Sequence, residues 1–352
     1  MKMKTIWIGA SSLATKLLNK WLKVSNKYLP DVILDNDINK AGTLLKGIPV
    51  DLVSNIQHYL VEDCEIIITS SYVSEIKAQL EGMNITNAID YKEKDREVSV
   101  PILSKNNQLY SRKNSNRCFV IGNAPSLNSL DLNKILKEDK IMVNSFYKKA
   151  ELLDLKPNFW VLADPIFWLN EEELLYPILN VLDNSLVDTQ LFIKDEALLL
   201  LERDIYHKDN VYFYNMNDSS DTINDDIDLT RAVPQFAQNV ISPALMLAIY
   251  LKYEEIILIG CDHTWWGYSK EEIEQGIIHP HIYSKSERDK VHHVDFFQSH
   301  GYEGVQETIE RQKYEYMELD RVARRKGIKI INATNGGYLE TFERVAYEDL
   351  FK

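Results

Sequence analysis

The 352-residue chain lacks several features that would place it in a specialised class of protein. Its three cysteines, Cys64, Cys118 and Cys261, lie far apart and form no CxxC pair, which argues against a disulfide framework and a zinc site. No run approaches the ~20 consecutive apolar residues that a membrane-spanning helix needs. The first residues lead directly into a strand-like segment, which predicts no signal peptide. Free buried thiols and a cytoplasmic location are therefore expected.

The chain also lacks an excess of positive charge. Its 40 Lys and Arg against 53 Asp and Glu give a net charge of -13, which argues against a nucleic-acid partner because a phosphate backbone would be repelled. The densest basic run, 321–326, is interpreted as the solvated end of a helix. A hydrophobic fraction of 45% is ordinary for a globular protein, and the length exceeds what one core usually organises. Two domains are therefore predicted.

Buried strand-like runs alternate with helical patterns along the whole chain, which favours parallel βαβ units. The predicted strands are 5–8, 31–37, 47–50, 65–70, 117–122, 140–144, 159–164, 191–193, 211–214, 255–260 and 329–332, and the clearest later helices are 242–250 and 303–326. The fold class is thus α/β, with two Rossmann-like domains and mainly parallel sheets. We expect a small first domain at 1–95, a polar linker at 96–116 and a second domain at 117–352.

Ligands of such sheets bind beyond the carboxyl ends of the strands, so the residues that follow each strand are the candidates for a site. In the second domain they are mostly small or carry amides or carboxylates. Gly122 allows a tight turn, and the Ser126 hydroxyl is expected near a helix N-terminus, where a phosphate would bind. The further candidates are Asn123, Asn144, Ser145, Asp164, Asp262, His263 and the run 332–335. Turn and capping chemistry is the alternative for any one of them.

Four segments of the second domain resemble, in the same order, motifs of the bacterial lipooligosaccharide sialyltransferases. Residues 121–127 look like their GNGPSL opening, 143–147 like "CNQFY", 240–244 like "ITSG", and 253–262 like "YKEIYLSGIDFY". A similar opening occurs in the wider family of motility-associated flagellin glycosyltransferases and the archaeal hydroxymethylpterin pyrophosphokinase. The resemblance covers most of 117–341 and implies a sialyltransferase-like single nucleotide-binding domain with a lid at about 264–301. It implies a glycosyltransferase that moves a sialic-acid-like sugar from a CMP donor to a glycan hydroxyl, without a required cofactor or metal.

The family's nucleotide-binding positions fall on matching residues here. The resemblance implies that Asn123, Ser126 and Asn144 hold the CMP phosphate and ribose, that Ser242 meets the nucleotide, and that Asp262 borders the donor. The family's general base is a lid histidine, and a base poised near neutral pH suits transfer to a hydroxyl. The lid stretch 276–301 contains five of the chain's eight histidines, namely His279, His281, His292, His293 and His300. We expect His300 to be the base, with His293, His263 and Asp262 as further catalytic candidates; a metal site at the adjacent pair His292–His293 is the rival interpretation.

Two departures from the family leave alternatives open. Asn239 stands where the family has an Arg, and 263–268 replaces its Tyr pair, so that either Tyr268 or Tyr283 assists the leaving group or the donor differs. Trp265 and Trp266 either stack on a sugar or pack the lid against the core. Asp164, followed by a proline, fits the pterin enzyme better; if it binds Mg²⁺, the protein is a metal-dependent diphosphotransferase. A non-catalytic sugar-nucleotide-binding scaffold is the third possibility.

The first domain resembles the N-terminal domain of sugar O- and N-acetyltransferases in segments 8–12, 32–37 and 46–50. The resemblance implies that Gly9, Ser11 and Asp35 contact a nucleotide-linked sugar; a docking role without a ligand is the alternative. The full GxGxxG pattern is missing, so a dinucleotide enzyme is poorly supported. The expected acceptor is an oligosaccharide or lipid-linked glycan precursor of capsule or lipopolysaccharide, built at the inner face of the cell membrane. Peripheral membrane contact and a homo-oligomer are both compatible with the sequence.

Overall fold

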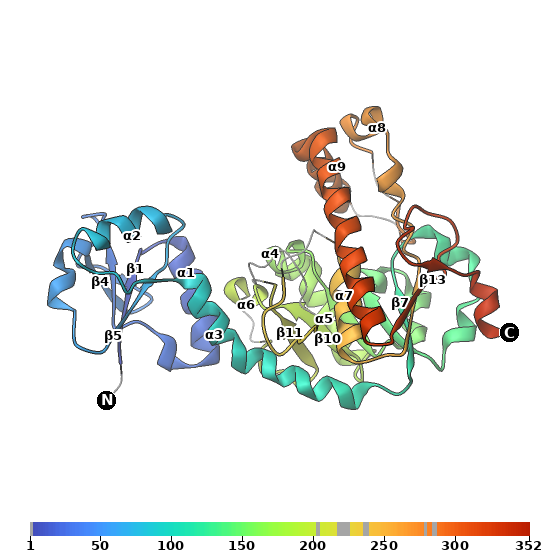
Figure 1. Ribbon diagram of the computed structural model, residues 1–352, viewed down its shortest axis with the longest axis horizontal. Coiled ribbons are helices and arrows are strands. Elements are labelled where there is room, and N and C mark those ends of the chain that lie inside the picture. Colours follow the sequence, from blue (N-terminus) through green and yellow to red (C-terminus); the bar gives the residue numbers. More distant parts are fainter. Residues whose placement is uncertain (1–2, 202–204, 217–225, 235–238, 278–279, 284–286) are drawn as a thin grey trace. The chain divides into compact units, whose positions relative to one another are not determined.

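A computed structural model describes residues 3–201, 205–216, 226–234, 239–277, 280–283 and 287–352. The chain forms two compact units, each with its own parallel-strand core and flanking helices (Figure 1). The first comprises Met1–Ser104 and Asp195–His207, and the second comprises Lys105–Lys194 and Lys208–Lys352. Both units are α/β and consistent with Rossmann-like domains, as the sequence pattern predicts.

The sheet of the first unit has the order β3-β4-β2-β1-β5-β6. Its strands are β1 (Lys4–Ile8), β2 (Val32–Asp35), β3 (Leu44–Leu45), β4 (Ile48–Leu52), β5 (Cys64–Ile68) and β6 (Ile89–Asp90). The sheet is mixed, because β3 and β4 form an antiparallel hairpin while the other neighbours are parallel. The order reverses at β1, whose neighbours β2 and β5 lie on its two sides.

The helices of the first unit are α1 (Ser12–Val24), α2 (Val73–Glu81), α3 (Tyr91–Ser104) and α6 (Ala197–Leu200). α1, α2 and α3 pack against this sheet, and α6 packs on α1. α1 begins after Ser11, whose side chain accepts the hydrogen bond of the Ala14 amide and so caps the first turn. Its Trp21 packs edge-on against Trp7 of β1, with ring centroids 4.9 Å apart. Such an aromatic pair stabilises the contact beyond the area it buries.

The domain boundaries differ from those expected. Residues 96–116 are no open linker, because α3 continues to Ser104 and a 3₁₀ helix follows at Lys105–Arg112. The chain also returns to the first unit at Asp195–His207, where α6 packs on α1. The sequence contains no signal for that return, since its apolar residues resemble those of any core helix.

A buried ion-pair cluster joins the returning segment to the first unit. The ammonium of Lys20 lies 2.8 Å from Asp95 and 2.7 Å from Asp195, and Ser99 donates to Asp195 at 2.8 Å. Lys20 is 1% exposed and Asp195 is 0% exposed. Burial by itself lowers the pKa of Lys20, but the two carboxylates outweigh burial and raise that pKa to about 12. α1, α3 and the segment after β10 are therefore held by one shared cation.

The sheet of the second unit is parallel throughout, in the order β11-β10-β9-β8-β7-β12-β13-β14. Its strands are β7 (Arg117–Ile121), β8 (Asp139–Val143), β9 (Phe159–Leu162), β10 (Gln190–Lys194), β11 (Val211–Tyr214), β12 (Glu255–Ile259), β13 (Lys329–Asn332) and β14 (Glu343–Arg344). The chain moves outward from β7 to β11 on one side and then returns to β12 on the other. β7 and β12 therefore flank the topological switch point, where ligands of such sheets bind.

Five helices of the second unit are described: α4 (Ile166–Leu169), α5 (Tyr176–Asn184), α7 (Ile241–Tyr250), α8 (Lys270–Glu274) and α9 (Glu287–Arg325). Every residue of α7 is buried, which accounts for its nearly continuous apolar sequence. α9 packs against α7 and α8, and Figure 1 shows α8 beside its first half. Helical geometry breaks at Gly301, where φ is 61° and ψ is 179°, values that essentially only glycine adopts. The break divides α9 into two helices, and the second of them corresponds to the helix predicted at 303–326.

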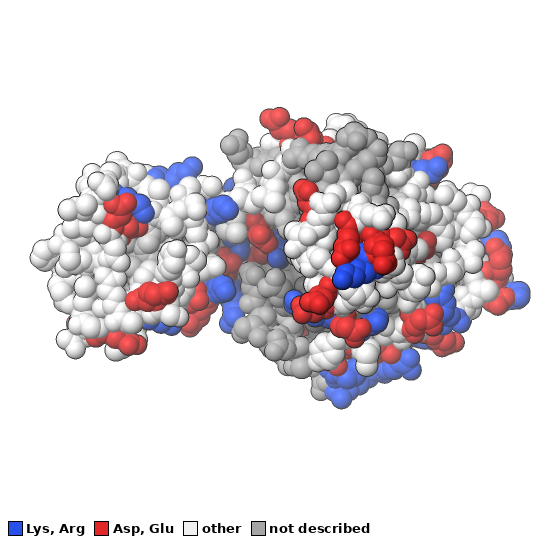
Figure 2. Space-filling model, turned by 90° about the horizontal axis from the view of Figure 1, so that it is seen from above, with Lys and Arg blue, Asp and Glu red and all other residues white. Residues whose placement is uncertain are grey.

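Acidic and basic side chains lie next to one another at several places on the face shown in Figure 2. The basic run at the end of α9 is paired in this way, with Arg321 2.8 Å from Glu318 and Arg324 2.6 Å from Asp320. The three cysteines are free; Cys118 and Cys261 are buried as expected, whereas Cys64 is only half-buried. Within the described ranges, no helix is both long and apolar enough to cross a membrane.

Candidate functional site

Two strand-end loops meet at the switch point of the second unit. Gly122 follows β7 and donates its amide to Ile259 O at 2.9 Å, and the amide of Ala124 donates to Gly260 O at 3.1 Å. A Cβ at Gly122 would overlap the Gly260 carbonyl, so only glycine permits the two backbones to approach this closely. The loop after β7 is therefore built against the loop after β12.

A carboxylate joins the two loops at their tips. Asp262 follows β12 and accepts hydrogen bonds from both the hydroxyl and the amide of Ser126, the latter at 3.3 Å. Asp262 is 7% exposed. Burial raises the pKa of its carboxyl above the ordinary value, although the Ser126 hydrogen bonds and the charge of Arg344 act the other way. Ser126 lies in a 3₁₀ helix of five residues, Pro125–Ser129, and its two donors face an anion that the protein itself supplies.

The next residue, His263, is buried and adopts a left-handed backbone conformation with φ 49° and ψ 37°. Its Nδ1 lies 2.9 Å from the carbonyl oxygen of Cys261, so Nδ1 carries the proton and donates it. Nε2 then accepts from the Tyr316 hydroxyl at 2.8 Å and from the Asn239 amide at 3.0 Å. Burial lowers the pKa of His263 to about 4, despite the opposing effect of the Cys261 hydrogen bond. The imidazole is neutral and both of its nitrogens are engaged, which fits a structural role better than that of the general base for which it was a candidate.

The Asp262–His263 turn is also closed from the loop after β13. Tyr338 donates its amide to Asp262 O at 2.8 Å, and a Cβ at Gly337 would lie 2.7 Å from Asp262 Cα. Arg344 holds this loop by donating to the carbonyls of Thr334 and Leu339, at 2.9 and 3.1 Å. Sequence reasoning missed Gly337, Tyr338 and Arg344; the double glycine at 336–337 was the available signal of a close backbone approach.

The loops after β8 and β9 contribute the next candidates along the same edge. Asn144 is left-handed, with φ 45°, and its side-chain oxygen accepts the amide of Ala163 at 3.4 Å. Ser145 is buried, and Asp164 accepts the amide of Ile166 at 3.0 Å at the start of α4. The Asp164 contact is the turn chemistry that was the alternative interpretation, whereas the Asn144 side chain joins the loops after β8 and β9.

Asn123 connects the β7 and β8 loops. Its side-chain amide donates to Val143 O at 2.9 Å, whereas its buried Oδ1 accepts no hydrogen bond from any described group. A part of the predicted lid contacts this residue, because Ile282 donates its amide to Asn123 O at 2.8 Å. Tyr283 follows, with Lys148 of the β8 loop 5.7 Å from its ring centre. The segment 280–283 therefore lies against the switch-point loops.

Ser242 does not lie on this edge as an accessible side chain. It is 0% exposed on α7 and donates to the buried Glu315 of α9 at 3.0 Å. The Ser242 side chain therefore has no exposed surface in this structure through which it could make the predicted contact with a nucleotide.

The structure describes the side chains of some lid histidines and not of others. His300 is exposed and contacts its own helix, where Nδ1 donates to Phe296 O at 2.8 Å. His279 and the side chain of His293 lie outside the described residues, as does that of His292. Among the described residues, no group of three or more His, Cys, Asp or Glu is arranged to hold a metal ion.

The two lid tryptophans pack rather than face outward. Trp265 lies edge-on to Phe296, and Trp266 donates to Gln312 at 3.1 Å while its ring lies 4.7 Å from that of His263. Both belong to an apolar cluster formed with α8 and α9. Of the two expectations for this pair, packing rather than sugar stacking accounts for these contacts.

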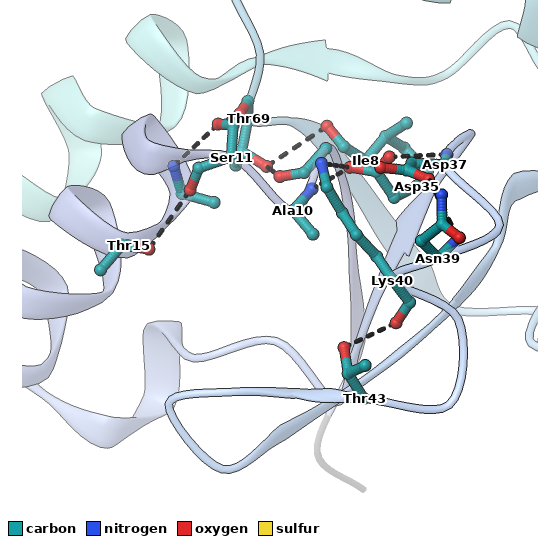
Figure 3. A network of polar contacts seen from close by, with 12 residues as sticks. Ile8, Ala10, Ser11, Thr15, Asp35, Asp37, Asn39, Lys40, Thr43 and Thr69 are labelled. Carbon is teal, nitrogen blue, oxygen red and sulfur yellow. Dashed lines mark hydrogen bonds and ion pairs between the residues drawn. The ribbon is translucent and has the colours of Figure 1, made fainter.

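The candidate residues of the first unit form the network shown in Figure 3. Ser11 caps α1 and donates to Thr69 O at 3.0 Å, which joins the β1 and β5 loops at that unit's own switch point. Asp35 accepts the amide of Ala10 at 2.7 Å and lies 3.1 Å from the ammonium of Lys40. Gly9, with φ 114°, permits the close approach to Thr69. The three predicted ligand contacts are thus brought together, and each also serves the local fold.

Substitutions at two adjacent glycines can test how tightly the turn at Asp262 is packed. Gly336 and Gly337 have φ of 79° and 81°, but a Cβ at Gly336 meets nothing within 4 Å. Gly336→Ala is expected to lower the free energy of unfolding of the second unit by about 1 kcal/mol through backbone strain alone. Gly337→Ala should cost about 1–3 kcal/mol more, because the methyl group must displace Asp262. Chemical denaturation of both variants measures the difference, and equal losses would contradict the packing argument.

Comparisons with protein-family models, curated proteins and solved structures give no match for the chain. The case for a function therefore depends on the geometry of the strand-end loops and the residues they carry.

Proposed function

We propose that the second unit is a nucleotide-sugar-dependent glycosyltransferase whose donor binds at the carboxyl edge of β7, β8 and β12. The observation that supports this most is the meeting of the 122–126 and 260–263 loops at the topological switch point. These loops belong to two of the four segments in which the sequence resembles the sialyltransferases. Residues that are 136 positions apart in the chain are thus in contact where a nucleotide ligand of such a sheet would lie.

In this proposal the donor carries a sialic-acid-like sugar on CMP, and the acceptor is a hydroxyl of a cell-surface glycan precursor. Asn123, Asn144 and Asp262 line the nucleotide, and the 280–283 segment covers it. The acceptor oxygen attacks the anomeric carbon while the bond from that carbon to the CMP phosphate oxygen breaks and CMP leaves with the electron pair. The hydroxyl proton passes to a base.

A lid histidine is the proposed base, and His300 is the described member of the lid cluster that is exposed. His263 is excluded from that task because its Nε2 already accepts from Tyr316 and Asn239. For His300 to act, the lid must bring it to the acceptor, and the Gly301 break beside it offers a position at which the helix direction can change. Contact with a membrane-bound acceptor at the inner face of the cell membrane belongs to the same proposal.

A thermal-shift comparison of CMP, UDP, GDP and ATP, each with and without Mg²⁺, tests the proposal. A ligand that binds only the folded state raises the melting temperature by mass action, and a concentration of 100 Kd corresponds to about 2.7 kcal/mol. We expect CMP to stabilise the protein without metal. Preference for ATP with Mg²⁺, lost in Asp164→Ala, would instead indicate a diphosphotransferase. CMP binding without transfer of sugar to any glycan would indicate a non-catalytic scaffold.

A further inference from the structure

The hydrogen-bond donors of the 122–127 loop are almost all used inside the protein. The amides of Gly122, Ala124 and Leu127 donate to Ile259, Gly260 and Ala124, respectively. The amide and hydroxyl of Ser126 donate to Asp262, and the side-chain amide of Asn123 donates to Val143. Position 125 is proline, which has no amide hydrogen. A phosphate needs donors, and this loop has already committed most of its own.

The switch-point loops offer hydrogen-bond acceptors instead. The Asp262 carboxylate has about four lone-pair positions, of which the described donors of Ser126 occupy two. Asn123 Oδ1 is buried and accepts from no described donor, although a buried amide oxygen is normally hydrogen-bonded. A phosphate at Ser126 would meet a carboxylate that competes for the same two donors and repels it.

We infer that the switch-point loops bind the nucleoside end of the ligand, through donors that it presents to Asp262 and Asn123, and that the phosphate lies elsewhere. The matching ligand groups are ribose hydroxyls or the exocyclic amine of cytosine. This inference rests on the proposed function and reverses the expectation that Ser126 seats the phosphate. Asp262 then selects for the nucleoside, and Ser126 orients Asp262.

The substitution Asp262→Asn distinguishes the two orientations because they predict opposite signs. If Asp262 accepts from the nucleoside, the affinity for cytidine falls at least tenfold and the affinity for CMP falls in parallel. If the phosphate lies on Ser126, removing the competing charge weakens the hold of residue 262 on the Ser126 donors and ends its repulsion of the phosphate, so the affinity for CMP rises while that for cytidine stays the same. Isothermal titration of both ligands against the full chain measures this, and the second result would overturn the inference.

Ligand analogues identify the contact and protect the test against a fold defect. In the wild-type protein, 2′,3′-dideoxycytidine should bind at least tenfold more weakly than cytidine if Asp262 contacts the ribose hydroxyls, and uridine should do so if it contacts the exocyclic amine. In Asp262→Asn, the loss of affinity for that analogue relative to cytidine should shrink below threefold. A loss of the same size in both proteins would overturn the inference. If Asp262→Asn does not fold, Ser126→Ala replaces it: the ratio of CMP to cytidine affinity stays within threefold of wild type if we are right and falls at least tenfold otherwise. If the wild-type protein binds neither cytidine nor CMP, that result would contradict both the proposed function and this inference.

Discussion

Lys20→Met is expected to lower the free energy of unfolding of the first unit by about 3–5 kcal/mol, the usual cost of breaking a buried ion pair by removing one partner. The ammonium of Lys20 is 1% exposed and lies within 2.8 Å of carboxylates from two other segments. Methionine keeps the apolar stem but leaves Asp95 and Asp195 facing each other without a cation. Two buried carboxylates in that state repel each other and lack a charge partner.

The first unit contains its own reporter for this experiment. The indole nitrogen of Trp21 donates to Asp95 at 2.8 Å, so its fluorescence responds when the cluster opens. Lys16→Met is the matched control, because it makes the same chemical change at an exposed position of the same helix and should stay within about 0.5 kcal/mol of wild type. Adding Asp195→Asn to Lys20→Met should restore part of the loss by removing one uncompensated charge. Equal stability of the two methionine variants would show that the cluster contributes no net stability.

This cluster also explains why the sequence predicts a linker where the structure has a helix. Apolar periodicity is the main signal for a helix, but α3 buries Lys94, Asp95 and Ser99 together with its apolar residues. Those polar side chains are buried because partners reach them from α1, β5 and the segment after β10. A pairing between residues 175 positions apart leaves no local pattern. The buried strands were found because β-branched and apolar runs report burial directly.

In the candidate site, too, some features can be predicted from the sequence and others cannot. The strand-end loops and their glycines are predictable, because parallel topology alone brings the ends of β7, β8 and β12 to one edge. The partners within that edge are not, since residue type does not show whether the Ser126 hydroxyl donates to a ligand or to Asp262. The hydrogen bond between Tyr316 and His263 was missed for the same reason, because Tyr316 occupies an ordinary core position of α9 in the sequence. Hydrogen-bond accounting in three dimensions is what separates a ligand-binding donor from a structural one.

His263 is expected to make the second unit acid-sensitive in a defined pH range. An unfolded chain binds a proton at this residue near pH 6.5, whereas burial holds the folded-state pKa at about 4. Between these values the unfolded state binds more protons, so the stability that the neutral imidazole contributes is present above pH 6.5 and is lost as the pH falls toward 4. The loss between pH 7.5 and pH 5 should be about 2 kcal/mol, at 1.36 kcal/mol per pH unit.

Protonation also has a geometric cost at this site. A proton on Nε2 would turn that atom into a donor facing the Asn239 amide, which lies 3.0 Å away and is itself a donor. Burial is the largest cause of the low pKa of His263, and the hydrogen bond from Nδ1 to Cys261 O acts in the opposite direction.

His263→Asn isolates the effect, because asparagine tolerates the left-handed backbone but does not titrate. Its destabilisation relative to wild type should be largest at pH 7.5 and about 2 kcal/mol smaller at pH 5, measured by denaturation at each pH. Nitrogen-15 spectra should show neutral His263 protonated at Nδ1 at pH 6. A charged ring at that pH, or a pH-independent cost of His263→Asn, would mean that the imidazole is not held by Tyr316 and Asn239 as described.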